Sequence, residues 1–175
     1  MSTFLGIDIG SRVVKVVLVN GDGYCLARKM APAGFDGPAL AAELVERVCA
    51  AGGVARSQVS WAVATGYGRV RFAGADAEIS EITCHARGAR HLVPEARTVI
   101  DIGGQDSKVI GLGPNGRVAD FVMNDRCAAG TGRFLEVTAE ALGLTVDEMA
   151  ALHEQSEHPV TISSTCTVFA ESEVV

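Results

Sequence analysis

Apolar residues recur along the chain with two different spacings. Short apolar runs occur at "TFLGI" and "VVKVVLV" near the start and again at "RTVI" and "KVIGL" after residue 96. Runs of this length bounded by Gly, Asn and Asp predict strands. In residues 37–53, by contrast, Leu40, Leu44, Val45 and Val48 follow a helical spacing, and two glycines end the segment. Strands that alternate with helices in this way predict an α/β fold.

The remaining pattern adds one strand and three helices. The segment "QVSWAVATGYG" predicts a buried strand that ends in a glycine turn, with Trp61 in the core. Residues 78–93 carry apolar residues along one helical face, and residues 133–142 predict a helix closed by Gly143. Thr145 and Glu148 have the spacing of a capping box, which predicts a further short helix.

An internal repeat organises these elements. "DIGSRVVKVV" begins at Asp8 and "DIGGQDSKVI" begins at Asp101, an offset of 93 residues, and the copies agree at Asp, Ile, Gly, Lys and Val. Each copy predicts a hairpin with Asp at the end of its first strand and Gly in the turn. The turns "NGDGY" and "GPNG" then lead into a third strand. We therefore predict two related subdomains, residues 1–94 and residues 95–175.

Composition and charge narrow the possible functions. A net charge of -6 without a long basic cluster argues against a nucleic-acid or anionic-membrane binder. No apolar run reaches the roughly 20 residues that span a bilayer, and the N-terminus has no signal-peptide pattern. A cytoplasmic protein is expected.

The cysteines are widely and irregularly spaced. Five cysteines without a C-x-x-C pair do not resemble a disulfide framework or a zinc ribbon. Cys25, Cys49 and Cys84 are expected to be buried, reduced and inert.

The repeat has the residues that a nucleotide triphosphate site needs. Gly10, Gly103 and Gly104, with Ser11 beside the first of them, offer backbone N–H donors that phosphates can approach closely. Asp8 and Asp101 are suited to hold Mg²⁺ through its water shell. Lys15 or Lys108 can neutralise phosphate charge, although a strand lysine more often faces solvent, and Gln105 can orient a water for hydrolysis. The alternative is that each "DIG" is only a strand and a turn.

The stretch "NDRCAAGTGRFLE" combines a glycine-rich turn with a cysteine. Gly130 and Gly132 before an apolar run are typical of a phosphate cradle at the start of a helix. Cys127 does not belong to that pattern. A thiolate near a helix N-terminus is stabilised there and becomes a better metal ligand.

The motifs "LGIDIGSRVVKVVLV", "ATGYGR", "VIDIGGQDSKVI", "NDRCAAGTGRFLE" and "ISSTCTVFAESEVV" together resemble one known family. This family contains the ATP-dependent activators of 2-hydroxyacyl-CoA dehydratases and the ATPase subunits of benzoyl-CoA reductase. The resemblance implies an actin-like, sugar-kinase-like ATPase fold with duplicated ribonuclease H-like subdomains. It also implies an ATPase coupled to electron transfer, in which ATP hydrolysis drives one low-potential electron into a partner dehydratase or benzoyl-CoA reductase-type enzyme.

The resemblance assigns the two remaining cysteines. A 4Fe-4S cluster takes four thiolates, and Cys127 and Cys166 match the family's cluster motifs, so a homodimer would hold one cluster between its subunits. Reduced ferredoxin or flavodoxin is the implied electron donor, with ATP and Mg²⁺ as further cofactors. The phosphate-loop motifs occur throughout the superfamily and are less specific than the cysteine motifs.

The chain departs from the family at its C-terminal end. Members continue beyond "ESEVV" with a glycine-rich turn that binds adenosine, and no glycine follows Gly143 here. We therefore expect a truncated second subdomain and weak ATP binding by the 175 residues alone.

Two other functions account for the repeat. One is a phosphotransferase of the sugar-kinase type, and the other is a non-enzymatic actin-like nucleotide switch. Neither gives Cys127 and Cys166 a role. Iron content therefore separates the activator from both alternatives.

Overall fold

A computed structural model describes residues 2–124, 130–162 and 172–174 of the chain. These residues form two compact units, Met1–Gly88 and Ala89–Val175, and each is described by itself. The predicted boundary between residues 94 and 95 stays a prediction. Within the described residues, no helix is long and apolar enough to cross a bilayer.

The first unit is built on a five-stranded sheet with the order β3-β2-β1-β4-β5. Its strands are β1 (Thr3–Ile9), β2 (Val13–Asn20), β3 (Cys25–Pro32), β4 (Trp61–Thr65) and β5 (Ala77–Glu78). β1 pairs antiparallel with β2 and parallel with β4, as a hairpin followed by a helical crossover requires. Short 3-10 helices occupy Arg56–Gln58 and Arg69–Arg71, and helix α2 (Glu81–Leu92) follows β5.

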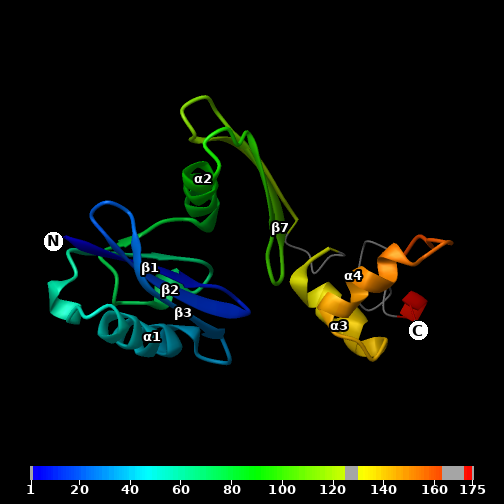
Figure 1. Cartoon of the computed structure of the whole chain (residues 1–175), viewed down its shortest axis with the longest axis horizontal. Coiled ribbons are helices and arrows are strands. Elements are labelled where there is room, and N and C mark those ends of the chain that lie inside the picture. Colours follow the sequence, from blue (N-terminus) through cyan, green and yellow to red (C-terminus); the bar gives the residue numbers. More distant parts are fainter. Residues whose placement is uncertain (1, 125–129, 163–171, 175) are drawn as a thin grey trace. The chain divides into compact units, whose positions relative to one another are not determined.

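Helix α1 (Gly37–Ala51) covers one face of this sheet, as Figure 1 shows. Asp36 caps its start by accepting a hydrogen bond from the Ala39 N–H, and Gly52 ends it. The predicted apolar stripe of α1 is confirmed, because Leu44, Val45 and Val48 are buried against β1 and β2. The core of the first unit therefore lies between α1 and the sheet.

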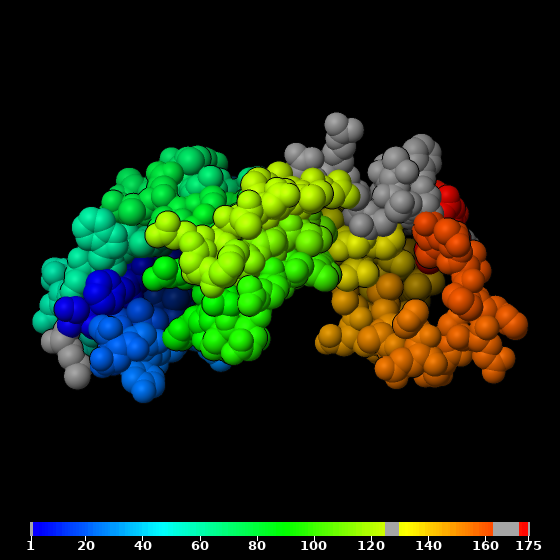
Figure 2. Space-filling view, turned by 90° about the horizontal axis from the view of Figure 1, so that it is seen from above, coloured from blue at the N-terminus to red at the C-terminus, as the bar shows by residue number. Residues whose placement is uncertain are grey.

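The second unit contains a three-stranded antiparallel sheet, β6 (Thr98–Ile102), β7 (Ser107–Leu112) and β8 (Val118–Asn124). Helices α3 (Gly132–Ala141) and α4 (Val146–Glu154) follow it, and Figure 2 shows their surfaces in contact. The predicted capping box of α4 is confirmed: the Thr145 N–H donates to Glu148, and the Glu148 N–H donates to the Thr145 hydroxyl.

The predicted three-strand repeat is confirmed in detail. Asp8 pairs in register with Lys15 on β2, and Asp101 pairs with Lys108 on β7. The register shifts between Leu18 and Val19 in one copy and between Gly111 and Leu112 in the other, again 93 residues apart. The shift in pairing register therefore lies at equivalent positions in both copies, and the two hairpins share one backbone design.

Three expectations about single residues are wrong. Trp61 is 50% exposed rather than buried, because the side chains of β4 that pack into the core are those of Ala62 and Ala64. Cys25 is exposed at the start of the edge strand β3, whereas Cys49 is buried as expected and Cys84 is half-buried. Lys108, expected to face solvent as a strand lysine, is only 2% exposed.

Candidate functional site

The first candidate loop follows β1 in the first unit. Asp8 lies next to the end of β1, and its Oδ2 accepts a hydrogen bond from the Lys15 Nζ at 2.8 Å. Both side chains reach solvent, with 54% of Lys15 and 23% of Asp8 exposed. The Gly10 N–H donates to the Val13 carbonyl at 3.2 Å, which closes the turn, and Ser11 is exposed within it. This loop presents a carboxylate, an ammonium group and an exposed turn.

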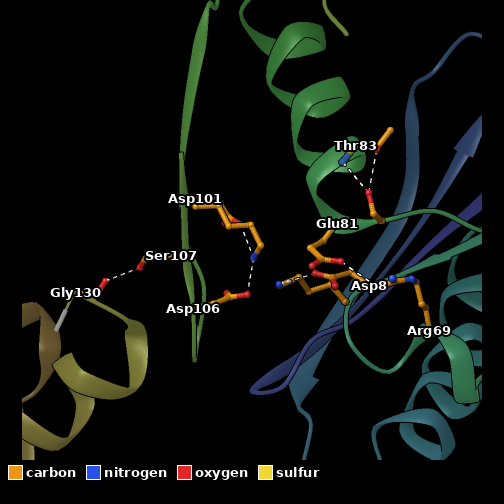
Figure 3. A network of polar contacts seen from close by, with 11 residues as sticks. Asp8, Arg69, Glu81, Thr83, Asp101, Asp106, Ser107 and Gly130 are labelled. Carbon is orange, nitrogen blue, oxygen red and sulfur yellow. Dashed lines mark hydrogen bonds and ion pairs between the residues drawn. The ribbon is translucent and has the colours of Figure 1, made fainter. Parts of the chain in front are cut away.

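A second turn supports the end of β1 through contacts that sequence reasoning missed. In "ATGYGR", the Gly68 N–H donates to the Ile9 carbonyl at 2.9 Å. Gly66 has a φ of +81°, and a Cβ there would lie 2.6 Å from the Asp8 Oδ1. Arg69 donates to the Gly66 carbonyl and to Glu81 of α2 at 2.9 and 3.1 Å, as Figure 3 shows for Arg69 and Glu81. In the sequence, the G-x-G spacing of Gly66 and Gly68 was the only indication that this turn supports the end of β1.

A cavity of about 830 Å³ opens beside the Asp8 and Lys15 pair. Its walls combine apolar strand residues with Arg28, Lys29 and two residues of α2, Cys84 and His85. Thr65, which pairs in register with Asp8, also lines it. The first loop therefore borders a space of the size that holds small ligands.

The second candidate loop, in the second unit, is more enclosed. Asp101 lies next to the end of β6, and its Oδ2 is 3.5 Å from the Lys108 Nζ. The same ammonium group donates to the Asp106 Oδ2 at 2.7 Å, as the dashed lines in Figure 3 indicate. The side chains of Lys108 and Asp106 are almost fully buried, and Asp101 is mostly so. A buried ammonium group thus holds two carboxylates, where the first loop has one exposed pair.

The turn of the second loop contacts the start of α3. The Gly103 N–H donates to the Asp106 carbonyl at 2.8 Å, as Gly10 does to Val13 in the first copy. The Gly103 and Gly104 carbonyls accept hydrogen bonds from the Gly132 and Arg133 N–H groups, both at 2.9 Å. Gln105 is exposed in this turn. The amide of Gly132 is therefore occupied by the loop, and its predicted contact with phosphate stays a prediction.

Thr131 caps α3, since its hydroxyl accepts a hydrogen bond from the Phe134 N–H at 3.3 Å. Gly130 has a φ of +89°, and its carbonyl accepts a hydrogen bond from the Ser107 hydroxyl, also drawn in Figure 3. The helix begins five residues after Cys127. Cys127 and Cys166, the predicted cluster ligands, lie outside the described residues.

The described residues can be compared with what Mg²⁺ needs, whereas the cysteines predicted to hold the iron-sulfur cluster lie outside them. Among them, no three His, Cys, Asp or Glu side chains form a group of metal ligands. Hydrated Mg²⁺ needs no such group, because it takes one or two carboxylates and keeps most of its waters. Asp101, which remains partly accessible at the second loop, suits that mode.

The chain is similar in sequence to several known proteins. The chain is 51% identical over 173 residues to the activator of lactoyl-CoA dehydratase of Anaerotignum propionicum, covering 98% of this chain and 66% of the relative. It is 36% identical over 179 residues to a subunit of the benzoyl-CoA reductase of Thauera aromatica, covering 100% and 63%. The chain spans 64% to 66% of the length of the dehydratase activators that it matches.

Solved structures agree with the fold. Component A of the (R)-2-hydroxyglutaryl-CoA dehydratase of Acidaminococcus fermentans matches with a TM-score of 0.90 at 43% identity, over 99% of this chain and 67% of that one. The activator of the 2-hydroxyisocaproyl-CoA dehydratase of Clostridium difficile, with bound ADPNP, matches with a TM-score of 0.86 at 46% identity, over 98% and 63%. A ROK hexokinase of Thermus thermophilus, at 15% identity and a TM-score of 0.54 over 89% and 70%, shares the fold alone.

These matches confirm the actin-like, sugar-kinase-like fold expected from the sequence. The model of the BadF/BadG/BcrA/BcrD ATPase family matches residues 5–175, which include both candidate loops and both cysteine motifs. The chain therefore belongs to the BadF/BadG/BcrA/BcrD ATPase family.

Proposed function

We propose that the intact protein containing this chain is an ATP-hydrolysing activator that transfers one low-potential electron to a 2-hydroxyacyl-CoA dehydratase. The observation that carries the proposal is the duplicated hairpin, which presents Asp8 with Gly10 and Asp101 with Gly103 at equivalent positions. Membership of an ATPase family supports a nucleotide as the ligand of these loops.

The degree of identity favours a dehydratase partner over a benzoyl-CoA reductase-type partner. The chain is 51% identical to an activator of a dehydratase and 36% identical to a benzoyl-CoA reductase subunit. The acyl-CoA itself would bind to the partner enzyme, so this chain needs no acyl-CoA site.

The roles at the loops follow from the chemistry of their side chains. Asp8 and Asp101 would contact hydrated Mg²⁺, and the exposed Lys15 would neutralise phosphate charge. Gly10, Ser11, Gly103 and Gly104 would offer close backbone approach to the phosphates. Gln105, exposed in the turn after Asp101, would orient the attacking water.

The electron would be carried by a 4Fe-4S cluster, which supplies one-electron chemistry at low potential. Cys127 and Cys166 would provide two thiolates from each subunit of a homodimer. Reduced ferredoxin or flavodoxin would be the donor. The sugar-kinase alternative has less support, since the likeness to the hexokinase is one of fold alone and leaves both cysteines without a role.

The test is anaerobic purification of the intact protein with assays for iron and for activation of a purified 2-hydroxyacyl-CoA dehydratase. We expect a dimer with about four iron atoms per two chains and activation that requires ATP. A Cys127→Ala, Cys166→Ala double variant should lose the iron, while a Cys25→Ala, Cys84→Ala control should keep it. A fully occupied cluster in the first variant, or sugar-dependent ADP formation without iron, would contradict the proposal.

A further inference from the structure

The two carboxylate oxygens of Asp8 have different neighbours. The Oδ2 atom accepts a hydrogen bond from the Lys15 Nζ at 2.8 Å. The Oδ1 atom lies against Gly66, where an added Cβ would be only 2.6 Å from it. The sheet brings Gly66 to this place, because Gly66 follows Thr65, the residue of β4 that pairs in register with Asp8. The position of the Asp8 carboxylate therefore depends on Lys15 on one side and on Gly66 on the other.

The turn at Gly66 is held by the side chain of Arg69. Gly66 is buried, and a buried carbonyl needs a hydrogen-bond donor. The Gly66 carbonyl accepts from the Arg69 backbone N–H at 3.3 Å and from the Arg69 Nη1 at 2.9 Å, so the guanidinium group provides the shorter bond. The Gly68 N–H donates to the Ile9 carbonyl at 2.9 Å and joins the same turn to the end of β1.

Glu81, the first residue of α2, orients the Arg69 side chain. Its Oε2 accepts a hydrogen bond from the same Nη1 at 3.1 Å, and Figure 3 shows this ion pair together with Asp8. The side chains of Arg69 and Glu81 are only 28% and 15% exposed. A guanidinium group that a carboxylate already holds loses less freedom when it donates to Gly66. Arg69 thus reaches Asp8 through the turn, since its hydrogen bonds go to Gly66 and Glu81.

We propose that Arg69, oriented by Glu81, is a positioning residue of the first loop. Arg69 holds the turn at Gly66, and the turn fixes the Oδ1 side of the Asp8 carboxylate. This inference rests on the proposed function, because Asp8 has its task at the nucleotide only there. It gives the motif "ATGYGR" a role in the rate of ATP hydrolysis.

The experiment replaces Arg69 in the intact protein and follows two measurements. One is kcat and KM for ATP hydrolysis, and the other is amide-exchange protection of Gly68, whose N–H donates to Ile9. Arg69→Met removes the guanidinium group and keeps a long side chain. We expect faster exchange at Gly68 and a kcat about tenfold lower, because a misplaced carboxylate slows the reaction. The KM for ATP should change by less than about threefold, since no contact with the nucleotide is removed.

Two further variants separate this role from a general loss of stability. One nitrogen of Arg69 makes both side-chain bonds, and an ammonium group can also donate to two acceptors, so Arg69→Lys should keep kcat within about threefold of the parent. Arg56→Met is the matched control, since the Arg56 Nη2 donates to the Gly74 carbonyl at 2.8 Å. It loses a bond of the same kind outside the Gly66 turn and should change neither kcat nor the exchange of Gly68.

A cycle with Asp8→Asn tests whether Arg69 acts through Asp8. In the Asp8→Asn background the carboxylate is already gone, so adding Arg69→Met should lower kcat by less than about a further twofold. If Arg69 only stabilised the fold, the substitution would cause the same loss in both backgrounds.

The outcomes distinguish the two proposals. A parent-like kcat in Arg69→Met, a raised KM as its main effect, or equal losses in both backgrounds of the cycle would overturn the positioning role. Failure of the proposed function looks different: the intact parent, with Arg69 in place, would then hydrolyse no ATP, and the positioning role would be contradicted with it.

Discussion

At Gly103 the second loop leaves no room for a side chain. A Cβ there would overlap the Asp106 carboxylate and lie 3.0 Å from the Asp106 carbonyl oxygen. At the equivalent Gly10, a Cβ would lie 2.8 Å from the Val13 carbonyl oxygen. Close contacts therefore favour glycine in both turns, with the Asp106 side chain and carbonyl at Gly103 and with the Val13 carbonyl at Gly10, whether or not a phosphate binds there.

Replacing Gly103 with alanine should destabilise the protein by about 1–3 kcal/mol, because the new methyl group must displace the Asp106 side chain or the turn. Gly88→Ala on α2 is the control, since a Cβ there would meet no atom of the described residues within 4 Å outside the backbone of its own helix and its chain neighbours. Alanine is the better helix former, so this control should gain about 0.5–1 kcal/mol. Urea unfolding measures both, and equal free energies of unfolding for the two variants would contradict the packing argument.

Loss of the Asp101 carboxylate should affect the rate of ATP hydrolysis more than the free energy of unfolding. Asp101→Asn is expected to slow ATP hydrolysis about a hundredfold, the scale seen when an electrostatic contact to developing charge is lost. Iron content should not change, and Asp22→Asn in the exposed turn after β2 should behave as the parent. Unchanged hydrolysis in both Asp8→Asn and Asp101→Asn would favour a repeat that is purely structural.

Among the elements, equivalent strands have acquired different environments. Ile7 of β1 is 1% exposed beneath α1, whereas the equivalent Ile100 of β6 is 72% exposed. Val16 and its equivalent Val109 differ in the same direction. The hairpins share their pairing register and the position of their register shift. Equivalent residues nevertheless differ in burial, because burial depends on what packs against each face of the strands.

Helix α4 provides an element-scale prediction through its cap. The hydrogen bond from the Thr145 backbone lowers the pKa of Glu148 from its ordinary value of 4.5, and the Thr145 hydroxyl lowers it further. Because the folded pKa is the lower one, the stabilisation is fully present above pH 4.5 and is lost as pH falls through the folded pKa.

Glu148→Gln should therefore reduce the stability of α4 at neutral pH, and its difference from the parent should disappear in acid. Amide-exchange protection of α4 over this pH range measures the effect. Glu154→Gln at the other end of the helix is the control. A difference that persists unchanged below the folded pKa would show that the carboxylate is not the stabilising group.

At the scale of the whole molecule, the proposed activity requires nucleotide and cluster to influence each other. In the second unit, the Gly103 and Gly104 carbonyls accept hydrogen bonds from the N–H groups of the first two residues of α3. That helix begins five residues after Cys127. A shift of the second loop would therefore be felt at the start of α3.

We expect the reduction potential of the cluster in the intact dimer to differ between ADP and a non-hydrolysable ATP analogue, by a coupling of about 1–3 kcal/mol. Arg133→Pro removes one of the two donors at a position where a helix tolerates proline, and it should reduce this difference. Arg133→Ala keeps the N–H group and is the control. Identical potentials with both nucleotides in the parent would mean that the bound nucleotide does not influence the cluster.

Local patterns in the sequence determined the elements and the duplicated hairpins. The strands, the stripe of α1 and the cap of α4 follow from residues close together in the chain, which is why their prediction succeeded. The aspartates at matching strand ends were likewise visible in the repeat. What the cysteines do was inferred from motifs, and it stays a prediction.

Only the tertiary structure decided which side of each strand is buried and what each charged group meets. Lys15 and Lys108 occupy the same place in the repeat, yet one is exposed and the other lies buried between two carboxylates. Trp61 is likewise exposed, because the burial of a strand residue depends on what packs against it and not on its own hydrophobicity. The alternation of residues along a strand defines the two faces of the strand but not what packs against each face. Burial and charge pairing therefore depend on residues far apart in the chain.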